Sequence, residues 1–407
     1  MRVALAPVGT RGDVQPMVAL GQRLRGAGHD VTMAVAENFR GLVEGAGLDY
    51  VRGGRDVESE VRARGEGMMN PVALFEITKS LVDEQLTMLD AACEGADVLV
   101  GSLLLTTGPT LAARRGIPLC ITSYFPSGFP SAEHPAPMMS MATAPAWVNE
   151  ASWAVQGVLT NIAMRGAINK RRAELGVAPV DDVQRHVVES AVPILATDIE
   201  LAPPPSIWAS RVHTTGFWFL DSATSLPPAL EAFLEAGEPP VYISFGSMPN
   251  DDPAMRTEIL VEACRTVSCR AVIGSGWGGL GGGATPPHVM TVGPVNHALL
   301  FDRVAAVVHH GGAGTTAAAA RAGVPQIVVP HYFDQFYWAD RVHALGLGPA
   351  PLGRAFQTGA LVTALRAALE DQVVKERAQR MSRRLRAYSG ADRAVALLEK
   401  VVAGVIK

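Results

Sequence analysis

Two histidines directly precede a glycine cluster in the stretch VVHHGGAGTTAAAA, residues 307–320. The β-branched pair indicates the end of a strand, and the alanine run after the glycines indicates a helix. Amides in the first turn of a helix have no intrahelical partner, and the helix dipole favours an anion there. Small residues let a phosphate approach the backbone, and a histidine at the strand end can donate a further hydrogen bond. The stretch therefore predicts a phosphate-binding corner, with the alternative that Thr315 or Thr316 caps a tightly packed helix.

The glycine pattern also fits a dinucleotide. GAGTTA, residues 312–317, matches GxGxxA from Gly312 onward, and Asp334 follows about twenty residues later, as a ribose-binding acid does. An NAD(P)-dependent oxidoreductase is therefore an alternative. Against it, the apolar run ends at Pro330 and HYF separates it from Asp334, whereas the ribose acid normally follows a strand directly. No lysine follows the glycines, so a P-loop is excluded.

Apolar runs of strand length alternate with helical patterns along the chain, which is typical of βαβ units on a parallel sheet. Residues 97–121 and 305–329 share one order of strand, small-residue turn, helix, glycine stop and proline. This internal echo predicts two similar α/β halves, and two such domains with parallel sheets would face a cleft with their loops. Examples of the expected strands are residues 3–8, 31–35, 98–100, 119–122, 241–245, 271–273, 305–308 and 326–329.

Proline-rich connectors at residues 201–208 and 225–240 indicate the boundary between the halves. We expect an N-terminal domain over residues 1–215, a linker over 216–240 and a second domain over 241–390. We expect residues 391–407 to form a C-terminal helix that packs back on the N-terminal domain.

Composition excludes several classes of partner. A formal charge of −4 gives no basic field for nucleic acid. Glycine and proline interrupt the longest uncharged stretches, and the N-terminal apolar run is too short for a signal peptide, so we expect a cytoplasmic protein without integral membrane segments.

Four cysteines without a CxxC pair suggest free buried thiols. The pair Asp251 and Asp252 reads as a turn and helix cap, so no metal is expected.

Several separate motifs, in order over essentially the whole chain, resemble the nucleotide-sugar-dependent glycosyltransferases that modify glycopeptide antibiotics, macrolides and sterols. The N-terminal GTRGDVQPMVALGQRLRGAGHDVTMAV is similar to the first loop of their acceptor half, and HTTGFWFLD to the bacterial and sterol-modifying members. Their donor half is similar to VYISFGSM, VGPVNHALLFDRVAAV, VVHHGGAGTT and RAGVPQIVVPHYFDQFYWADRV. The resemblance implies a GT-B fold of two Rossmann-like domains whose parallel sheets face a cleft, with the acceptor in the first domain and the nucleoside diphosphate sugar in the second. It also implies inversion at the anomeric carbon without an obligatory metal.

The resemblance assigns the donor contacts. His310 aligns with the phosphate-binding histidine of the family, and His309 would lie on the other face of the strand. The amides of the following turn would hold the diphosphate, a hydroxyl at another strand end would donate to it, and the Asp-Gln pair would bind sugar hydroxyls. The other donor-binding residues are Thr10, Arg11, Gly246, Ser247, Trp277, Val295, Gly312, Ala313, Gly314, Thr315, Asp334 and Gln335.

Four of these assignments have structural alternatives. Trp277 would stack on the base, or plug a packing gap, while Val295 would contact the base through its backbone. Arg11 would reach the diphosphate, or be a solvated charge. Asp334 and Gln335 could simply begin a helix.

Asp13 in GTRGDVQP is the candidate general base, because inverting transfer needs a group that removes the acceptor hydroxyl proton. It matches the acid at this place in the glycopeptide-type members. The sequence departs from those relatives that have a histidine in this loop, because no histidine is near Asp13. The alternative is an N-cap on the helix that Pro16 helps to start, and both roles are compatible.

Residues 67–75 and 123–147 combine methionine, aromatic residues and proline, which suits a bulky apolar aglycone or, alternatively, plain core packing. The acceptor-binding candidates are Met69, Phe75, Phe125 and Met138.

The sequence thus predicts an inverting glycosyltransferase that uses a UDP- or TDP-sugar as cosubstrate, without a cofactor. Its acceptor would be a hydrophobic polyketide, glycopeptide or sterol-like aglycone, and the protein a monomer or homodimer. A nucleotide-sugar epimerase on the same architecture and a non-catalytic auxiliary homologue remain alternatives besides the oxidoreductase.

Overall fold

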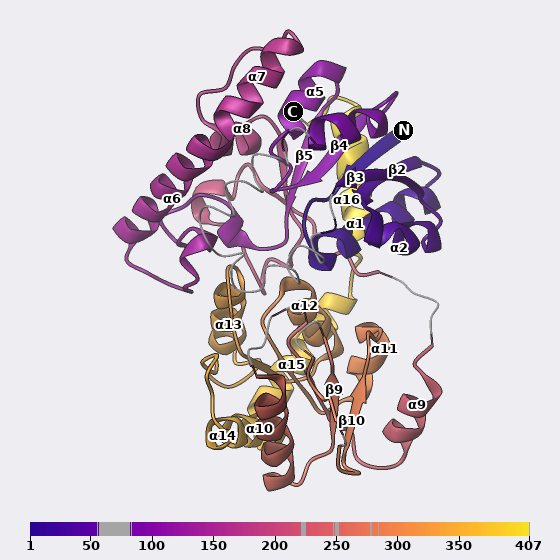
Figure 1. Ribbon diagram of the computed structural model, residues 1–407, viewed down its shortest axis with the longest axis vertical. Helices are drawn as coiled ribbons and strands as arrows, with labels where there is room; N and C mark the ends of the chain where they lie inside the picture. Colours follow the sequence, from indigo (N-terminus) through magenta and orange to yellow (C-terminus); the bar gives the residue numbers. More distant parts are fainter. Residues whose placement is uncertain are drawn as a thin grey trace. The chain divides into compact units, whose positions relative to one another are not determined.

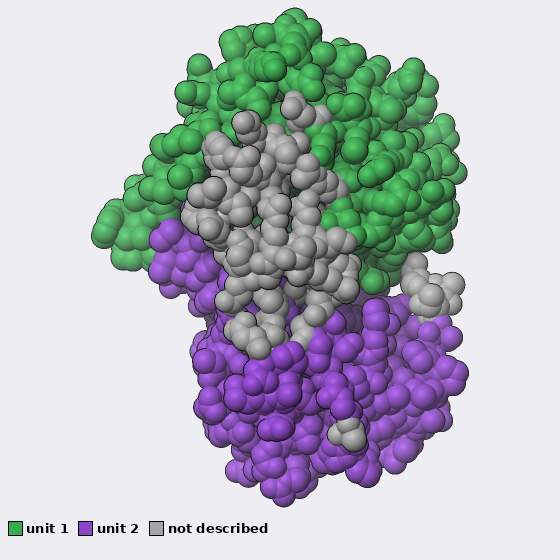
Figure 2. All heavy atoms as spheres, viewed as in Figure 1, with its two compact units in different colours: residues 1–136, 144–220, 389–407 green, residues 137–143, 221–388 purple. Residues whose placement is uncertain are grey.

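The chain divides into two compact units (Figure 2). Unit 1 comprises Met1–Ala136, Ala144–Leu220 and Ser389–Lys407, and unit 2 comprises Pro137–Thr143 and Asp221–Tyr388. The computed structural model describes residues 1–54, 56, 82, 84–220, 225–246, 248, 252–276, 279–283 and 285–406.

Unit 1 is built on a seven-stranded parallel sheet with the order β3-β2-β1-β4-β5-β6-β7 (Figure 1). Its central strands are nearly continuous apolar runs that are buried on both faces, as expected for a parallel sheet covered by helices. The strands are β1 (Arg2–Ala6), β2 (Asp30–Ala36), β3 (Asp49–Gly54), β4 (Val98–Ser102), β5 (Leu119–Ser123), β6 (Val192–Leu195) and β7 (His213–Thr214). The helices are α1 (Arg11–Gly26), α2 (Arg40–Gly45), α5 (Gly108–Arg115), α6 (Ala146–Thr160), α7 (Gly166–Glu174), α8 (Val183–Glu189) and α16 (Gly390–Val402).

The C-terminal helix α16 packs against α1 within unit 1. His29 Nε2 lies 3.1 Å from a carboxylate oxygen of Glu399, and Arg23 lies 3.6 Å from Asp392. Gly390 begins this helix where a Cβ would come within 2.4 Å of the carbonyl oxygen of Phe217, so only glycine permits the approach. The last segment of the chain is therefore an integral part of unit 1.

Unit 2 has a five-stranded parallel sheet with the order β10-β9-β8-β11-β12. Apolar side chains of α10 and α14 pack on one face of it and those of α9, α11 and α12 on the other. The strands are β8 (Val241–Ser244), β9 (Ala271–Gly274), β10 (Val289–Val292), β11 (Ala306–His309) and β12 (Gln326–Val328). The helices are α9 (Pro228–Glu235), α10 (Pro253–Thr266), α11 (His297–Leu300), α12 (Ala313–Ala322), α13 (Gln335–Ala344), α14 (Thr358–Glu370) and α15 (Gln372–Arg386).

The predicted α/β class with two Rossmann-like parallel sheets is confirmed, since both sheets begin in the order 3-2-1-4-5. In each sheet the order reverses beside the first strand, between β1 and β4 in unit 1 and between β8 and β11 in unit 2. The carboxyl ends of these strands are where such folds bind ligands. Within the described ranges, no helix is long and apolar enough to cross a membrane.

Candidate functional site

Asp13 lies just beyond the carboxyl end of β1, at the point where the strand order of unit 1 reverses. The connection is fixed to β4, because the amide of Val8 donates to Ser102 Oγ at 3.0 Å. Helix α1 begins at Arg11, with Thr10 rather than Asp13 as its N-cap. Thr10 Oγ1 accepts from the amide of Gly12 at 3.3 Å.

The Asp13 carboxylate closes a capping box at the start of α1. Its Oδ2 accepts from the backbone amide of Thr10 at 2.8 Å and lies 3.4 Å from Thr10 Oγ1. The carboxyl also receives a hydrogen bond from its own backbone amide, and no neighbouring described residue donates to Oδ1. The carboxyl therefore has one oxygen that orients it and a second that is available to a ligand.

Burial sets the proton affinity of this carboxyl. Asp13 is only partly exposed, and desolvation raises its pKa to about 6 although the hydrogen bonds from Thr10 act in the opposite direction. Gly9, at a φ of +136°, makes room for the group, because a Cβ there would lie 2.1 Å from Asp13 Oδ2. A base with a pKa near 6 is ionised at neutral pH and still takes up a proton readily.

Tyr124 was not predicted, but it contacts the same turn. Its hydroxyl donates to the backbone carbonyl of Asp13 at 3.1 Å, and its ring packs edge-on against Trp218. Burial, and secondarily the Asp13 carboxylate, raises the pKa of Tyr124 well above its ordinary value, so the hydroxyl stays a donor. The sequence signals for Tyr124 were its place directly after β5 and its membership of the aromatic-rich residues 123–147.

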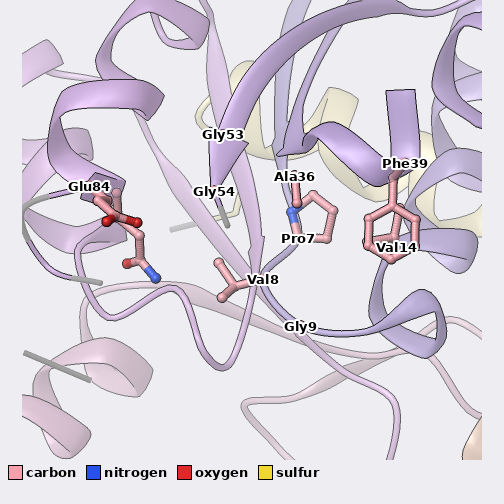
Figure 3. Close-up of a pocket in the computed structure, with 10 residues that line it drawn as sticks. Pro7, Val8, Gly9, Val14, Ala36, Phe39, Gly53, Gly54 and Glu84 are labelled. Carbon is pink, nitrogen blue, oxygen red and sulfur yellow. The ribbon is translucent and has the colours of Figure 1, made fainter. Parts of the chain in front are cut away.

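A small, partly open pocket lies beside this turn in unit 1 (Figure 3). It is bounded by the carboxyl ends of β1, β2 and β3 and by Val14 of α1. Gln85 brings a polar group to the lining, and its Nε2 is buried without a hydrogen-bond partner while its Oε1 accepts from Thr107. The lining residues are Pro7, Val8, Gly9, Val14, Ala36, Phe39, Gly53, Gly54, Glu84 and Gln85.

In unit 2 the glycine-rich turn follows β11. The parallel register pairs His309 with Ser244, so His310 and Gly246 both lie just beyond the carboxyl ends of adjacent strands. His309 is fully buried: its Nε2 bonds Gln326 at 2.9 Å and its Nδ1 accepts from the amide of Gly311 at 3.1 Å. Burial lowers the pKa of His309 to about 4, so it is a neutral residue that shapes the turn.

His310 has no hydrogen-bond partner among the described residues, and its Nδ1 is a buried unpaired nitrogen. Its ring lies between two glycines: a Cβ on Gly246 would be 3.0 Å from Cε1, and one on Gly312 would be 2.6 Å from Nε2. Burial, and then the neighbouring His309, lowers its pKa to about 3. The ring is therefore neutral at pH 7, and a buried group of this kind normally has a partner.

The start of α12 carries free donors beside this ring. Gly312 is the N-cap and provides no side-chain cap, so the first-turn amides have no side-chain acceptor. Thr316 Oγ1 instead donates to the carbonyl of Gly312 at 3.0 Å, so the alternative in which a threonine caps this helix is wrong. The predicted residues Gly312, Ala313, Gly314 and Thr315 thus come together with His310 and Gly246.

Asp334 and Gln335 begin α13 next to the same turn, since a Cβ on Gly311 would lie 2.9 Å from the Gln335 carbonyl. The Gln335 side chain is engaged locally: its Oε1 accepts from the amides of His331 and Tyr332, and its Nε2 contacts Met248 Sδ at 3.2 Å. Asp334 is partly exposed and makes no side-chain capping bond to α13.

The remaining predicted residues are distributed as follows. Arg11 is exposed and its Nε donates to Gln15. Val295 is partly buried before α11. Phe125 follows Tyr124 at the end of β5. Met138 is 41% exposed in Pro137–Thr143, the segment of unit 2 in which Ser140 Oγ accepts from the amide of Phe333. Met69, Phe75, Ser247 and Trp277 lie outside the described residues.

Two family models match the chain, one in each half. Residues 3–127 match the glycosyltransferase family 28 N-terminal domain. Residues 279–395 match the C-terminal domain of erythromycin biosynthesis protein CIII-like proteins.

Known proteins match over nearly the whole length. The vancomycin aglycone glucosyltransferase of Amycolatopsis orientalis is 34% identical over 405 residues, 98% of each chain. A sterol 3-beta-glucosyltransferase of Arabidopsis thaliana is 34% identical over 86% of this chain, which spans 60% of that longer protein. The solved glycosyltransferase of kitacinnamycin has a TM-score of 0.75 at 21% identity, covering 98% of this chain and 99% of that one. The chain therefore belongs to the GT-B glycosyltransferases, the family of these antibiotic- and sterol-modifying enzymes.

Proposed function

We propose that this glycosyltransferase transfers a sugar from a UDP- or TDP-sugar to a hydroxyl of a hydrophobic natural-product aglycone, with inversion at the anomeric carbon. The observation that carries the donor side is the unpaired His310 ring beside the uncapped start of α12. The two features offer neutral donors and a positive dipole end at one place, which suits a diphosphate. In this proposal no metal or cofactor is needed to offset the leaving-group charge.

Asp13 is the general base in this proposal. Its Oδ1 takes the proton of the acceptor hydroxyl, the acceptor oxygen bonds to the anomeric carbon, and the bond to the diphosphate oxygen breaks. The electron pair of that bond leaves on the diphosphate, where the first-turn amides of α12 and a ring nitrogen of His310 stabilise it. A single displacement of this kind inverts the anomeric configuration.

The sugar hydroxyls are assigned to the loop that begins α13. Asp334 provides a carboxylate at this place. The Gln335 carboxamide must release the amides of His331 and Tyr332 before it can bind the sugar. We therefore assign Asp334 the main role in sugar binding and Gln335 the minor one. Gly246 and the backbone at Val295 complete the proposed donor contacts.

The acceptor is placed in the pocket beside Gly9. Its lining is apolar apart from Glu84 and Gln85, which suits contact with one edge of a hydrophobic aglycone rather than enclosure of the whole ligand. The relatives named for an antibiotic aglycone and for sterols support this class of acceptor.

A ligand panel and one variant test the proposal. UDP or TDP should raise the melting temperature of the protein and NAD should not, because only a ligand of the folded state stabilises it. Asp13→Asn should then abolish transfer to a hydrophobic aglycone while its affinity for the nucleoside diphosphate stays within about twofold of wild type. Stabilisation by NAD alone would favour the oxidoreductase, and near-normal transfer by the variant would remove Asp13 from the mechanism.

A further inference from the structure

Helix α6 carries an apolar face that nothing in the described structure covers. Trp147, Val155, Val158 and Ile162 recur at helical spacing and are exposed by 72%, 53%, 58% and 66%. Leu159 widens the face and is 48% exposed. Residues 151–164 contain no Asp, Glu, Lys or Arg. A continuous exposed stripe of this kind marks an interaction surface rather than scattered surface residues.

The opposite face of α6 is firmly held by unit 1, so the stripe does not result from a loosely packed helix. Asn149 Nδ2 donates to the carbonyl of Ala132 at 2.8 Å, and Trp153 Nε1 donates to the carbonyl of His134 at 2.9 Å. Met164 is buried one turn beyond the helix end. The orientation of the exposed stripe is therefore fixed.

One charge of each sign lies near the stripe. Glu150 lies between Trp147 and the part of the stripe over residues 155–162, and Arg165 follows Ile162, fifteen positions after Glu150. The described part of the chain provides no ion pair for either: Glu150 is exposed, and Arg165 donates only to the backbone carbonyl of Asp181 at 3.3 Å. Residues Asn161–Arg165 form a wider π-helical turn, which brings Arg165 back toward the flank of the helix that carries Glu150.

We propose that this face binds a second copy of the same chain, with the two α6 helices antiparallel about a twofold axis near Val158. The midpoint of Glu150 and Arg165 falls between residues 157 and 158. A twofold axis at that point places Glu150 beside the partner's Arg165, and Arg165 beside the partner's Glu150, while the apolar stripes meet between them. The surface is thus complementary to itself in both polarity and charge.

The size of the surface determines how stable the dimer is. A standard interface buries about 800 Å² on each partner, which exceeds what one helix stripe offers. We therefore expect a reversible dimer that dissociates on dilution in the micromolar range rather than an obligate one.

Sedimentation velocity of the full chain from 1 to 100 µM tests this proposal. The wild type should shift from monomer to dimer, and Val158→Glu should stay monomeric at every concentration. Because Val158 is mostly exposed, this variant should keep the melting temperature of the wild type monomer, which separates lost association from lost folding.

Charge reversal provides the sharper test. Glu150→Arg should raise the dimer dissociation constant about tenfold, because it removes two symmetry-related ion pairs and sets like charges together. The double variant Glu150→Arg with Arg165→Glu should restore the wild-type value, and Glu94→Arg, an equal charge change at an exposed site of the same unit, should leave it unchanged. A wild type that stays monomeric, or a double variant that does not recover, overturns the proposal. If wild-type monomers bind phosphatidylcholine vesicles and Val158→Glu abolishes that binding, the dimer proposal is overturned in favour of a lipid surface.

Discussion

Replacing Asp13 with asparagine should stabilise the protein at neutral pH even though it destroys the proposed base. Burial raises the pKa of Asp13 from 3.8 to about 6, so the folded state holds this proton more tightly than the unfolded state does. The favourable contribution is present below pH 4 and is lost as the pH rises through about 6. The difference corresponds to about 3 kcal/mol, at about 1.4 kcal/mol for each pKa unit.

Asparagine removes the titration and keeps the cap, since its side-chain oxygen can still accept from the amide of Thr10. The free energy of unfolding of Asp13→Asn should therefore exceed that of wild type by up to about 3 kcal/mol at pH 8, and the two should converge near pH 4. Urea unfolding, with amide hydrogen exchange of β1 and α1 peptides as a readout local to unit 1, measures this gap.

Asp392 offers a matched control, because it is also the third residue of a helix behind a serine N-cap, in α16. Its side chain is 61% exposed, so Asp392→Asn reports the effect of the same substitution at the same helix position without the burial of Asp13. A gap for Asp13→Asn that is constant from pH 4 to pH 8, or one that narrows as the pH rises, would refute the assignment of a desolvated carboxyl.

Three further outcomes are expected. The kcat/KM of the wild type should fall about tenfold per pH unit below pH 6, as the proposed base becomes protonated, and a profile that is flat down to pH 5 would contradict this role. His310→Ala should weaken UDP affinity, measured calorimetrically, by about ten- to a hundredfold. Burial keeps the pKa of His310 near 3, so the ring is neutral. His310→Gln, which keeps a neutral donor, should therefore lose less UDP affinity than His310→Ala, and equal losses of affinity would refute the role of a neutral donor. Gly312→Ala should impair UDP binding, because the added Cβ displaces the His310 ring. Gly359→Ala is the control, since a Cβ there has no neighbour within 4 Å and should leave UDP binding unchanged. Unchanged binding by Gly312→Ala would show that the position of the ring is unimportant.

Local patterns predicted the fold and the two strand-end turns, because strand, turn and helix signals lie within a few residues of one another. The start of α1 was readable too, because Thr10 and Asp13 have the spacing of a capping box, whereas the predicted alternative had Asp13 itself as the N-cap. The engagement of Gln335 with His331 and Tyr332 depends on the actual loop conformation, including Phe333 at a φ of +55°, and composition does not encode it.

Long-range contacts were beyond the reach of the sequence. Tyr124 meets the turn of Asp13 across 111 residues. The neutral state of His309 follows from its burial in the sheet, where its Nε2 bonds Gln326 of the adjacent strand. Only the folded register brings such groups together. The grouping of Pro137–Thr143 with unit 2 is of the same kind, because its flanking segments belong to unit 1.

The incorporation of α16 into unit 1 restricts how such enzymes can be recombined. A chimera joined once, near residue 220, would lay a foreign terminal helix on α1, with mismatched partners for His29, Arg23 and the backbone of Phe217. Grafting of a new unit 1 should therefore transplant residues 389–407 along with it, at two junctions instead of one. A separately expressed second half that keeps this tail would expose Leu398 and Val401, which are buried in the intact chain, and should aggregate.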